Sequence, residues 1–322
     1  MEYLLLLALF VFVIGTVVGS FLNVVVLRGL SGESIVLPPS KCPKCGNKLK
    51  PWHNVPILSY LFLRGKCAFC KEKISIQYPL VEAFTGLTFL SVFWVFGFSA
   101  VTIFALLAAC TMIVLAVTDI REKVICVNHA YFLIAVGLIF NTYITLFWKT
   151  NLLDVIHIPL VNSILGLIAG VVVMEALARL GYLLVGRRAF GEGDSYIAAG
   201  LGAFFGWKPL LIILALAVGV QMVMVLPAFA KRLVQNKDFS TLIPLVGFFI
   251  FAGAFWYLNE NGFLENIFLL YSSMLAFLIL GIYTCRKILA GLKEPKDFTM
   301  LPFGPAMVIA AFVVMFMHSL WI

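Results

Sequence analysis

The chain has 322 residues, of which 63% are hydrophobic and 12% charged, with a net charge of +8 and a mean hydropathy of +1.08. A water-soluble protein of this length could not bury so much apolar surface, so the composition excludes a soluble enzyme or binding module. Most basic residues fall in loops between apolar stretches. This placement indicates that they set the orientation of the chain in a membrane, and it disfavours nucleic acid as a partner.

Ten apolar stretches follow one another along the chain, and most are long enough to cross about 30 Å of hydrocarbon as helices. They lie at 3–27, 79–97, 100–118, 129–148, 158–185, 195–207, 209–230, 243–258, 264–285 and 299–320. None alternates apolar and polar residues, which disfavours a membrane barrel. The sixth stretch is short and rich in glycine, as in a half-helix that lines a cavity. The predicted fold is an all-α, polytopic transmembrane bundle with a small cytoplasmic zinc-knuckle domain.

The placement of basic residues predicts the orientation of the bundle in the membrane. The alternation of ten spans puts five loops on one side, at 28–78, 119–128, 186–194, 231–242 and 286–298. These loops hold 20 of the 23 Lys and Arg residues. The positive-inside rule therefore places them in the cytoplasm and both termini in the periplasm. We expect the first span to be an uncleaved anchor, because no basic region precedes it and Arg28 follows it.

Four cysteines stand in the longest hydrophilic loop as two Cys-x-x-Cys pairs separated by 21 residues. They are Cys42, Cys45, Cys67 and Cys70. Two such knuckles supply four thiolates, which together complete a tetrahedral zinc site. With four protein ligands the metal has no open position, so the predicted zinc is structural. The alternatives are two disulfides or unrelated thiols, and the reducing cytoplasm disfavours the disulfides.

Two aspartates lie where membrane spans meet the predicted cytoplasmic face. Asp119 ends the third span, and Asp194 follows Gly191 and Gly193 at the start of the sixth. A carboxylate at such a boundary costs free energy, so two at matching depth suggest a function. If they share one proton, one can act as a general base on water while the other polarises a carbonyl group. This is the arrangement of an aspartyl protease.

Each aspartate also has a simpler interpretation when it is considered alone. Asp119 could be a helix-end charge paired with Arg121 or Lys123, and Asp194 could be the N-cap of the following helix. A third acidic residue, Glu82, is expected in the first turn of the second span, where a negative charge suits the helix dipole. The catalytic interpretation therefore depends on the two aspartates lying together.

Six segments, in this order, resemble the bacterial type IV prepilin peptidases and cover about three-quarters of the chain. They are GSFLNVVVLR (19–28), CPKCG (42–46), PWHNVPILSYLFLRGKCAFCKEKISIQYPLVE (51–82), TDIREKVI (118–125), GEGDSYIAAGLGAFFGW (191–207) and LPFGPAMVIAA (301–311). The combination is far more specific than any one motif. The Gly-x-Gly-Asp pattern is similar to that of presenilin-like intramembrane proteases.

The resemblance implies an inner-membrane endopeptidase that removes the leader of type IV prepilins or type II secretion pseudopilins after a glycine. It implies that Asp119 and Asp194 are catalytic and that the four knuckle cysteines bind zinc. It also implies N-methylation of the new N-terminus with S-adenosylmethionine, although no glycine-rich nucleotide loop in 28–78 marks a site for that cofactor. A peptidase without methyltransferase activity and a small transporter with a regulatory zinc loop remain alternatives.

The sequence also departs from the family pattern at three places. Cys126 stands where proline is usual, and Tyr196 stands where lysine is common. The stretch 231–298 adds about two spans before the last one. The expected parts are the anchor 1–27, the zinc-binding domain 28–78, the catalytic helices 79–230, the insertion 231–298 and the C-terminal helix 299–322.

Overall fold

The computed structural model describes residues 2–37, 39–147, 158–185, 190–235 and 303–317, with isolated positions between 243 and 283. Two compact units divide the chain. The first comprises Met1–Ala176, Gly191–Val218 and Pro302–Ile322, and the second comprises Leu177–Phe190 and Gly219–Leu301. Most of the two predicted spans in the insertion 231–298 falls outside the described residues. All the predicted site residues belong to the first unit.

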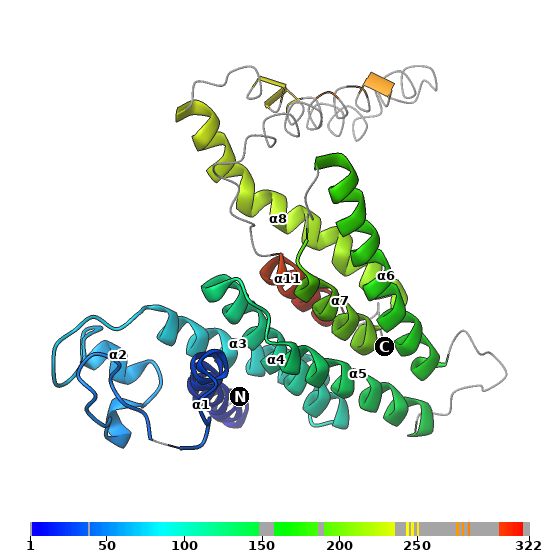
Figure 1. The fold of residues 1–322 in the computed structure, drawn as a ribbon. Helices are drawn as coiled ribbons and strands as arrows, with labels where there is room; N and C mark the ends of the chain where they lie inside the picture. The colour runs from blue at the N-terminus through cyan, green and yellow to red at the C-terminus, as the bar shows by residue number, and fades with distance from the viewer. Residues whose placement is uncertain are drawn as a thin grey trace. The chain divides into compact units, whose positions relative to one another are not determined.

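Six helices in the described ranges are long and apolar enough to cross a membrane. They are α1 (Glu2–Ser31), α3 (Gln77–Phe96), α4 (Ala100–Glu122), α5 (Val127–Phe147), α6 (Pro159–Val185) and α8 (Trp207–Gln235) (Figure 1). Two apolar helices are shorter, namely α7 (Glu192–Phe205) and α11 (Gly304–Phe316). The 14 residues of α7 extend about 21 Å, so it is too short for a full crossing, as the sequence predicts. These helices confirm the all-α membrane fold.

Helix α4 carries Asp119 one turn before its C-terminal end. Its N-terminus is capped by Ser99, whose hydroxyl accepts a hydrogen bond from the Thr102 amide at 3.3 Å. Its C-terminus is set by Lys123, which adopts a left-handed conformation and donates its amide to the Asp119 carbonyl at 2.9 Å. The helix therefore continues one turn beyond the predicted span, and Asp119 lies inside it.

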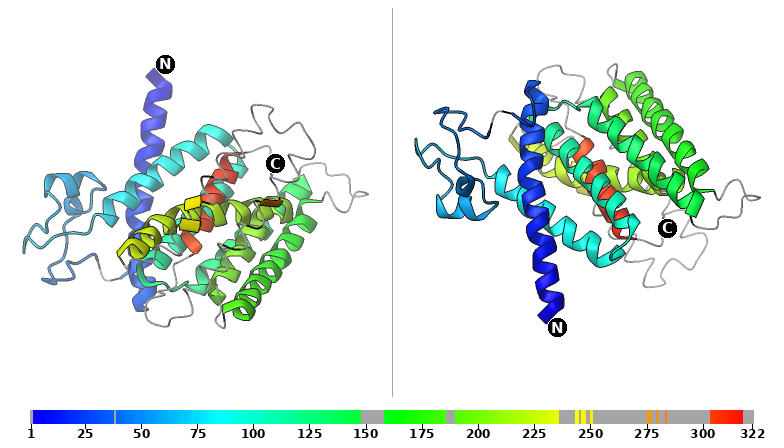
Figure 2. Two further views of the ribbon diagram at one scale, coloured as in Figure 1. Left: turned by 90° about the horizontal axis from the view of Figure 1, so that it is seen from above. Right: turned by 90° about the horizontal axis from the view of Figure 1, so that it is seen from below.

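Small residues bring α1 and α3 together side by side (Figure 2). A Cβ atom added to Gly15 would lie 2.8 Å from the Gly86 Cα, and one added to Gly19 would lie 2.8 Å from the Glu82 Cα. Close backbone approach of this kind is how membrane helices associate when the hydrophobic effect does not act between them. The contact fixes α3, and with it Glu82, against the first helix.

Helix α7 is held between α5 and α6 by glycines and buried polar side chains. The Asn141 amide donates hydrogen bonds to the Ala203 and Phe204 carbonyls at 3.1 and 3.0 Å. A Cβ atom added to Gly137 would lie 2.6 Å from the Ala203 carbonyl carbon, and one added to Gly166 would overlap Gly202. These contacts place the C-terminal half of α7, and its direction then determines where Asp194 lies.

Candidate active site and metal centre

The Asp119 side chain is buried, with 4% of its surface exposed, and it is anchored by a backbone amide. The Gly304 amide donates a hydrogen bond to its Oδ2 atom at 3.0 Å. Arg121 pairs instead with Glu122, with an Nε to Oε1 distance of 3.3 Å, and Lys123 ends the helix. The simpler interpretation of Asp119, as a helix-end charge paired with Arg121 or Lys123, therefore does not describe its surroundings.

Asp194 is also buried, with 7% of its surface exposed, and it is the third residue of α7. Its Oδ2 atom accepts a hydrogen bond from the Gly191 amide at 3.0 Å. The side chain thus reaches back to the N-cap residue before the helix and satisfies the amide of that residue. Asp194 therefore stabilises the helix start from inside the helix and is not itself the N-cap. Its other oxygen is not used by this contact.

The structure brings the two aspartates together at one site. Helices α4 and α7 both pack against α5 and against α11, so their acidic ends share a common environment. Burial, followed by the negative charge of Asp119, raises the pKa of the Asp194 carboxyl to about 6, while the Gly191 amide acts in the opposite direction. Two carboxyl groups that sense each other in this way can share a single proton.

Gly304, at the start of α11, is a site residue that sequence reasoning left without a role. A Cβ atom at this position would lie 2.5 Å from the Asp119 Oδ2 atom and 3.1 Å from the Ile197 Cδ1 atom. Only a residue without a side chain leaves room for the backbone amide to reach the carboxylate. The available signal was the glycine beside Pro305, a residue type that favours the first turn of a helix.

The four predicted zinc ligands form one cluster, and all four are free thiols. Their sulfur atoms lie within 4.8 Å of one another, and those of Cys42 and Cys70 are 3.9 Å apart. Two thiolates on a tetrahedral zinc ion would be about 3.8 Å apart, given a Zn–S bond of about 2.3 Å. The donor set and the spacing fit zinc, so the cluster can bind a metal ion.

The two knuckles have the same backbone geometry. In each, the residue after the second cysteine donates its amide to the first cysteine's carbonyl, at 2.9 Å for Gly46 and 3.1 Å for Lys71. Both residues have positive φ, at 70° and 61°. Backbone hydrogen bonds from Cys70 and Phe69 lower the pKa of the Cys67 thiol to about 7. Such a thiol is readily converted to the thiolate that a metal requires.

Glu82 ties the zinc-binding loop to the membrane helices. It lies in the second turn of α3, not in the first turn as expected, and it is 7% exposed. Its Oε2 atom accepts a hydrogen bond from the Ile57 amide at 2.7 Å. Ile57 has a φ of 60°, which is costly for a β-branched residue, and the buried carboxylate stabilises it there. The hydrogen bond from the Ile57 amide therefore explains the position of the buried Glu82 carboxylate better than the helix dipole does.

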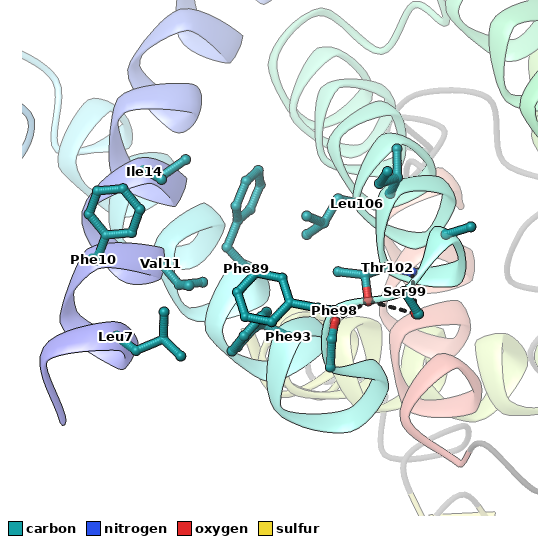
Figure 3. Close-up of a pocket in the computed structure, with 13 residues that line it drawn as sticks. Leu7, Phe10, Val11, Ile14, Phe89, Phe93, Phe98, Ser99, Thr102 and Leu106 are labelled. Atoms are coloured by element: carbon teal, nitrogen blue, oxygen red, sulfur yellow. Dashed lines mark hydrogen bonds between the residues drawn. The ribbon is translucent and has the colours of Figure 1, made fainter. Parts of the chain in front are cut away.

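An apolar cavity of about 540 Å³ lies between α1, α3 and α4 (Figure 3). Its lining includes Phe10, Phe89 and Phe98. The hydroxyls of Ser99 and Thr102 bond to each other at 3.1 Å. Thr102 is 17 residues from Asp119 along α4, or about 25 Å. The residues that line this cavity offer no acid or base, so it does not compete with the aspartate pair as a candidate active site.

Two family models match the chain. The model described as the bacterial peptidase A24 N-terminal domain matches residues 13–96, and the model described as the type IV leader peptidase family matches residues 106–226. The first match contains the cysteine cluster and Glu82, and the second contains both aspartates. The comparison with solved structures found no match.

Curated relatives agree with these matches over most of the chain. A protein of Neisseria gonorrhoeae named "Prepilin leader peptidase/N-methyltransferase" is 33% identical over 268 residues, which cover 74% of this chain and 88% of the relative. Proteins with the same name from Pseudomonas aeruginosa and Myxococcus xanthus are each 33% identical, and the matches cover 86% and 68% of those relatives and 74% and 72% of this chain. The chain therefore belongs to the type IV leader peptidase family.

Proposed function

We propose that Asp119 and Asp194 are the catalytic pair with which this membrane-embedded peptidase removes the leader peptide of prepilins. The observation that carries the proposal is the juxtaposition of two buried carboxyl groups from helices far apart in the sequence. Each accepts a backbone hydrogen bond at 3.0 Å, and the charge of Asp119 acts on Asp194. Burying two carboxyl groups beside each other costs free energy. A purely structural role could be filled without this cost, so the pair points to a function.

In the proposed reaction, Asp194 holds the shared proton and Asp119 is ionised. The Asp119 carboxylate takes a proton from a water molecule, whose oxygen attacks the carbonyl carbon of the last residue of the leader. The protonated Asp194 donates a hydrogen bond to the carbonyl oxygen and stabilises the charge that develops there. When the C–N bond breaks, the leaving amine takes a proton from the pair, and the products are the leader carboxylate and a new N-terminal amine.

The new amine is also the group that a methyltransferase would modify. The names of the relatives pair the peptidase with an N-methyltransferase, and we extend that second activity to this chain, with S-adenosylmethionine as the methyl donor. The proposed substrates are prepilins or type II secretion pseudopilins, cut after a glycine. No residue of this chain is assigned to the cofactor.

The proposed setting is the bacterial inner membrane, with the zinc loop and the aspartates at the cytoplasmic face and both termini in the periplasm. The distribution of Lys and Arg supports this orientation. Zinc, when bound by the four cysteines, would supply folding free energy to a loop that has little hydrophobic core of its own. In this proposal the metal takes no part in peptide hydrolysis.

The test of the function is cleavage of a candidate prepilin by membranes that contain this chain, with mass analysis of the product. We expect loss of the leader after a glycine, and a further gain of one methyl group only when S-adenosylmethionine is added. A cleaved but unmethylated product would support a peptidase without the second activity. No cleavage of pilin or pseudopilin leaders would refute the proposal.

The contact between Gly304 and Asp119 gives a second prediction. The Gly304→Ala change places a methyl group against the Asp119 carboxylate, which must then shift. A misplacement of about 1 Å in a catalytic group reduces the rate by roughly a hundredfold, and we expect a loss of that size in the cleavage rate.

The matched control is Gly219→Ala in α8, where an added Cβ meets no other atom within 4 Å. This variant should cleave at the wild-type rate. Equal activity of both alanine variants would show that the Gly304 amide does not position the carboxylate.

A further inference from the structure

A short helix in the zinc-binding loop, α2 (Leu58–Phe62), exposes an apolar surface outside the membrane-crossing helices. The exposed fractions are 52% for Leu58, 63% for Leu61 and 83% for Phe62. Three large apolar side chains on a five-residue helix form an exposed patch that calls for an explanation, since scattered surface residues would not cluster in this way. We call this set of three residues the α2 patch.

The depth of the α2 patch is fixed by a buried contact. The Ile57 amide, directly before α2, donates to the Glu82 carboxylate at 2.7 Å. Glu82 is the sixth residue of α3, so it lies about 7.5 Å along the axis from the start of a helix that crosses the membrane. The α2 helix therefore begins within two turns of the end of a helix that is long enough to cross a membrane.

The surroundings of the α2 patch are strongly basic. Between residues 41 and 73 the loop exposes eight basic side chains, against a single acidic one, Glu72. They are Lys41, Lys44, Lys48, Lys50, Arg64, Lys66, Lys71 and Lys73. A surface with this charge complements a leaflet that carries anionic lipid headgroups.

Hydrogen bonds join the basic and apolar parts into one surface. Arg64 and Lys66 follow directly after α2, and the Gly65 amide donates to the Tyr60 carbonyl at 2.9 Å. The second knuckle returns to the same point, because the Ile74 amide donates to the Gly65 carbonyl at 2.8 Å. The cysteine cluster thus holds basic residues next to the α2 patch.

We propose that the zinc-binding loop docks on the membrane surface through α2 and binds anionic lipid headgroups. Leu58, Leu61 and Phe62 enter the boundary between headgroups and acyl chains, and the neighbouring Lys and Arg side chains contact lipid phosphates. An apolar face combined with basic residues is the composition of segments that lie in this interface. The proposal does not depend on the peptidase reaction, since it concerns a surface that the aspartates do not share.

The test is hydrogen–deuterium exchange of residues 55–66 in the full-length, zinc-loaded protein. The protein is placed in nanodiscs of phosphatidylcholine with and without phosphatidylglycerol. We expect exchange to be roughly tenfold slower with the anionic lipid, and this difference to shrink at high salt. The double change Leu61→Ser and Phe62→Ser should remove the protection while zinc content stays the same.

A matched control is Phe98→Ser, because Phe98 is 85% exposed but lies two residues beyond the opposite end of α3. This variant should keep the lipid-dependent protection of residues 55–66. Equal exchange in the two lipid compositions would overturn the proposal. Protection that arises only when a prepilin is added would also overturn it, and would assign the surface to the substrate.

Discussion

We expect Asp119→Asn and Asp194→Asn each to reduce prepilin cleavage by at least about a thousandfold. An asparagine keeps the size of the side chain but can neither take a proton from water nor share one with its partner. The backbone contacts from Gly304 and Gly191 go to a carbonyl-type oxygen, which an amide also provides. Protein level and zinc content should therefore be unchanged, and the loss should appear in the rate of cleavage.

Matched controls for this result lie beside each aspartate. Glu122 is three residues after Asp119, with 50% of its side chain exposed, and Glu192 is an exposed residue two positions before Asp194. Glu122→Gln and Glu192→Gln remove the same charge nearby, and both variants should cleave within about twofold of the wild type, as is usual for surface substitutions. Normal cleavage by either aspartate variant would refute the proposed mechanism.

The second large effect is expected at the cysteine cluster. Cys42→Ser or Cys67→Ser removes one thiolate from a four-sulfur site, and we expect bound zinc to fall from about one ion per chain to almost none. Metal binding supplies on the order of 10 kcal/mol to such small domains, so residues 39–76 should become sensitive to limited proteolysis. Zinc analysis and digestion with a protease measure the two consequences.

The control is Cys126→Ser, since Cys126 is a partly exposed thiol outside the cluster. This variant should retain its zinc and its resistance to protease. Full zinc content in the Cys42 and Cys67 variants would show that the cluster does not bind the metal. Cleavage that is slowed but still measurable in these variants would agree with a metal that has a structural role.

The sequence was sufficient to predict the membrane helices that the structure describes and to single out the aspartates. Long apolar stretches and the cost of a carboxylate in a membrane are local properties, so they can be read without a structure. The short, glycine-rich sixth stretch predicted a half-helix, and α7 has only 14 residues. The predicted roles of Asp119 and Asp194 and the boundaries of the five parts remain predictions.

Contacts between distant segments could not be predicted in the same way. Gly304 bonds to a residue 185 positions earlier, and no spacing rule relates the two. The contact of Glu82 with Ile57 depends on the path of a 45-residue connection between α1 and α3. Lys71 adopts the left-handed backbone conformation because the turn of the knuckle requires it, although lysine favours conformations with negative φ. These features follow from tertiary packing, which overrides local preference.

The tight packing of α7 limits how this enzyme can diverge. Backbone from α5 and α6 lies against Gly202 and Ala203, and the Leu133 side chain lies 2.9 Å from where a Cβ atom of Gly200 would be. Larger residues at these positions would push the helix away and move Asp194 with it. Tyr196, near the start of the same helix, differs from these positions, because its ring meets the Tyr131 ring edge-on at 5.8 Å and a large side chain fits there.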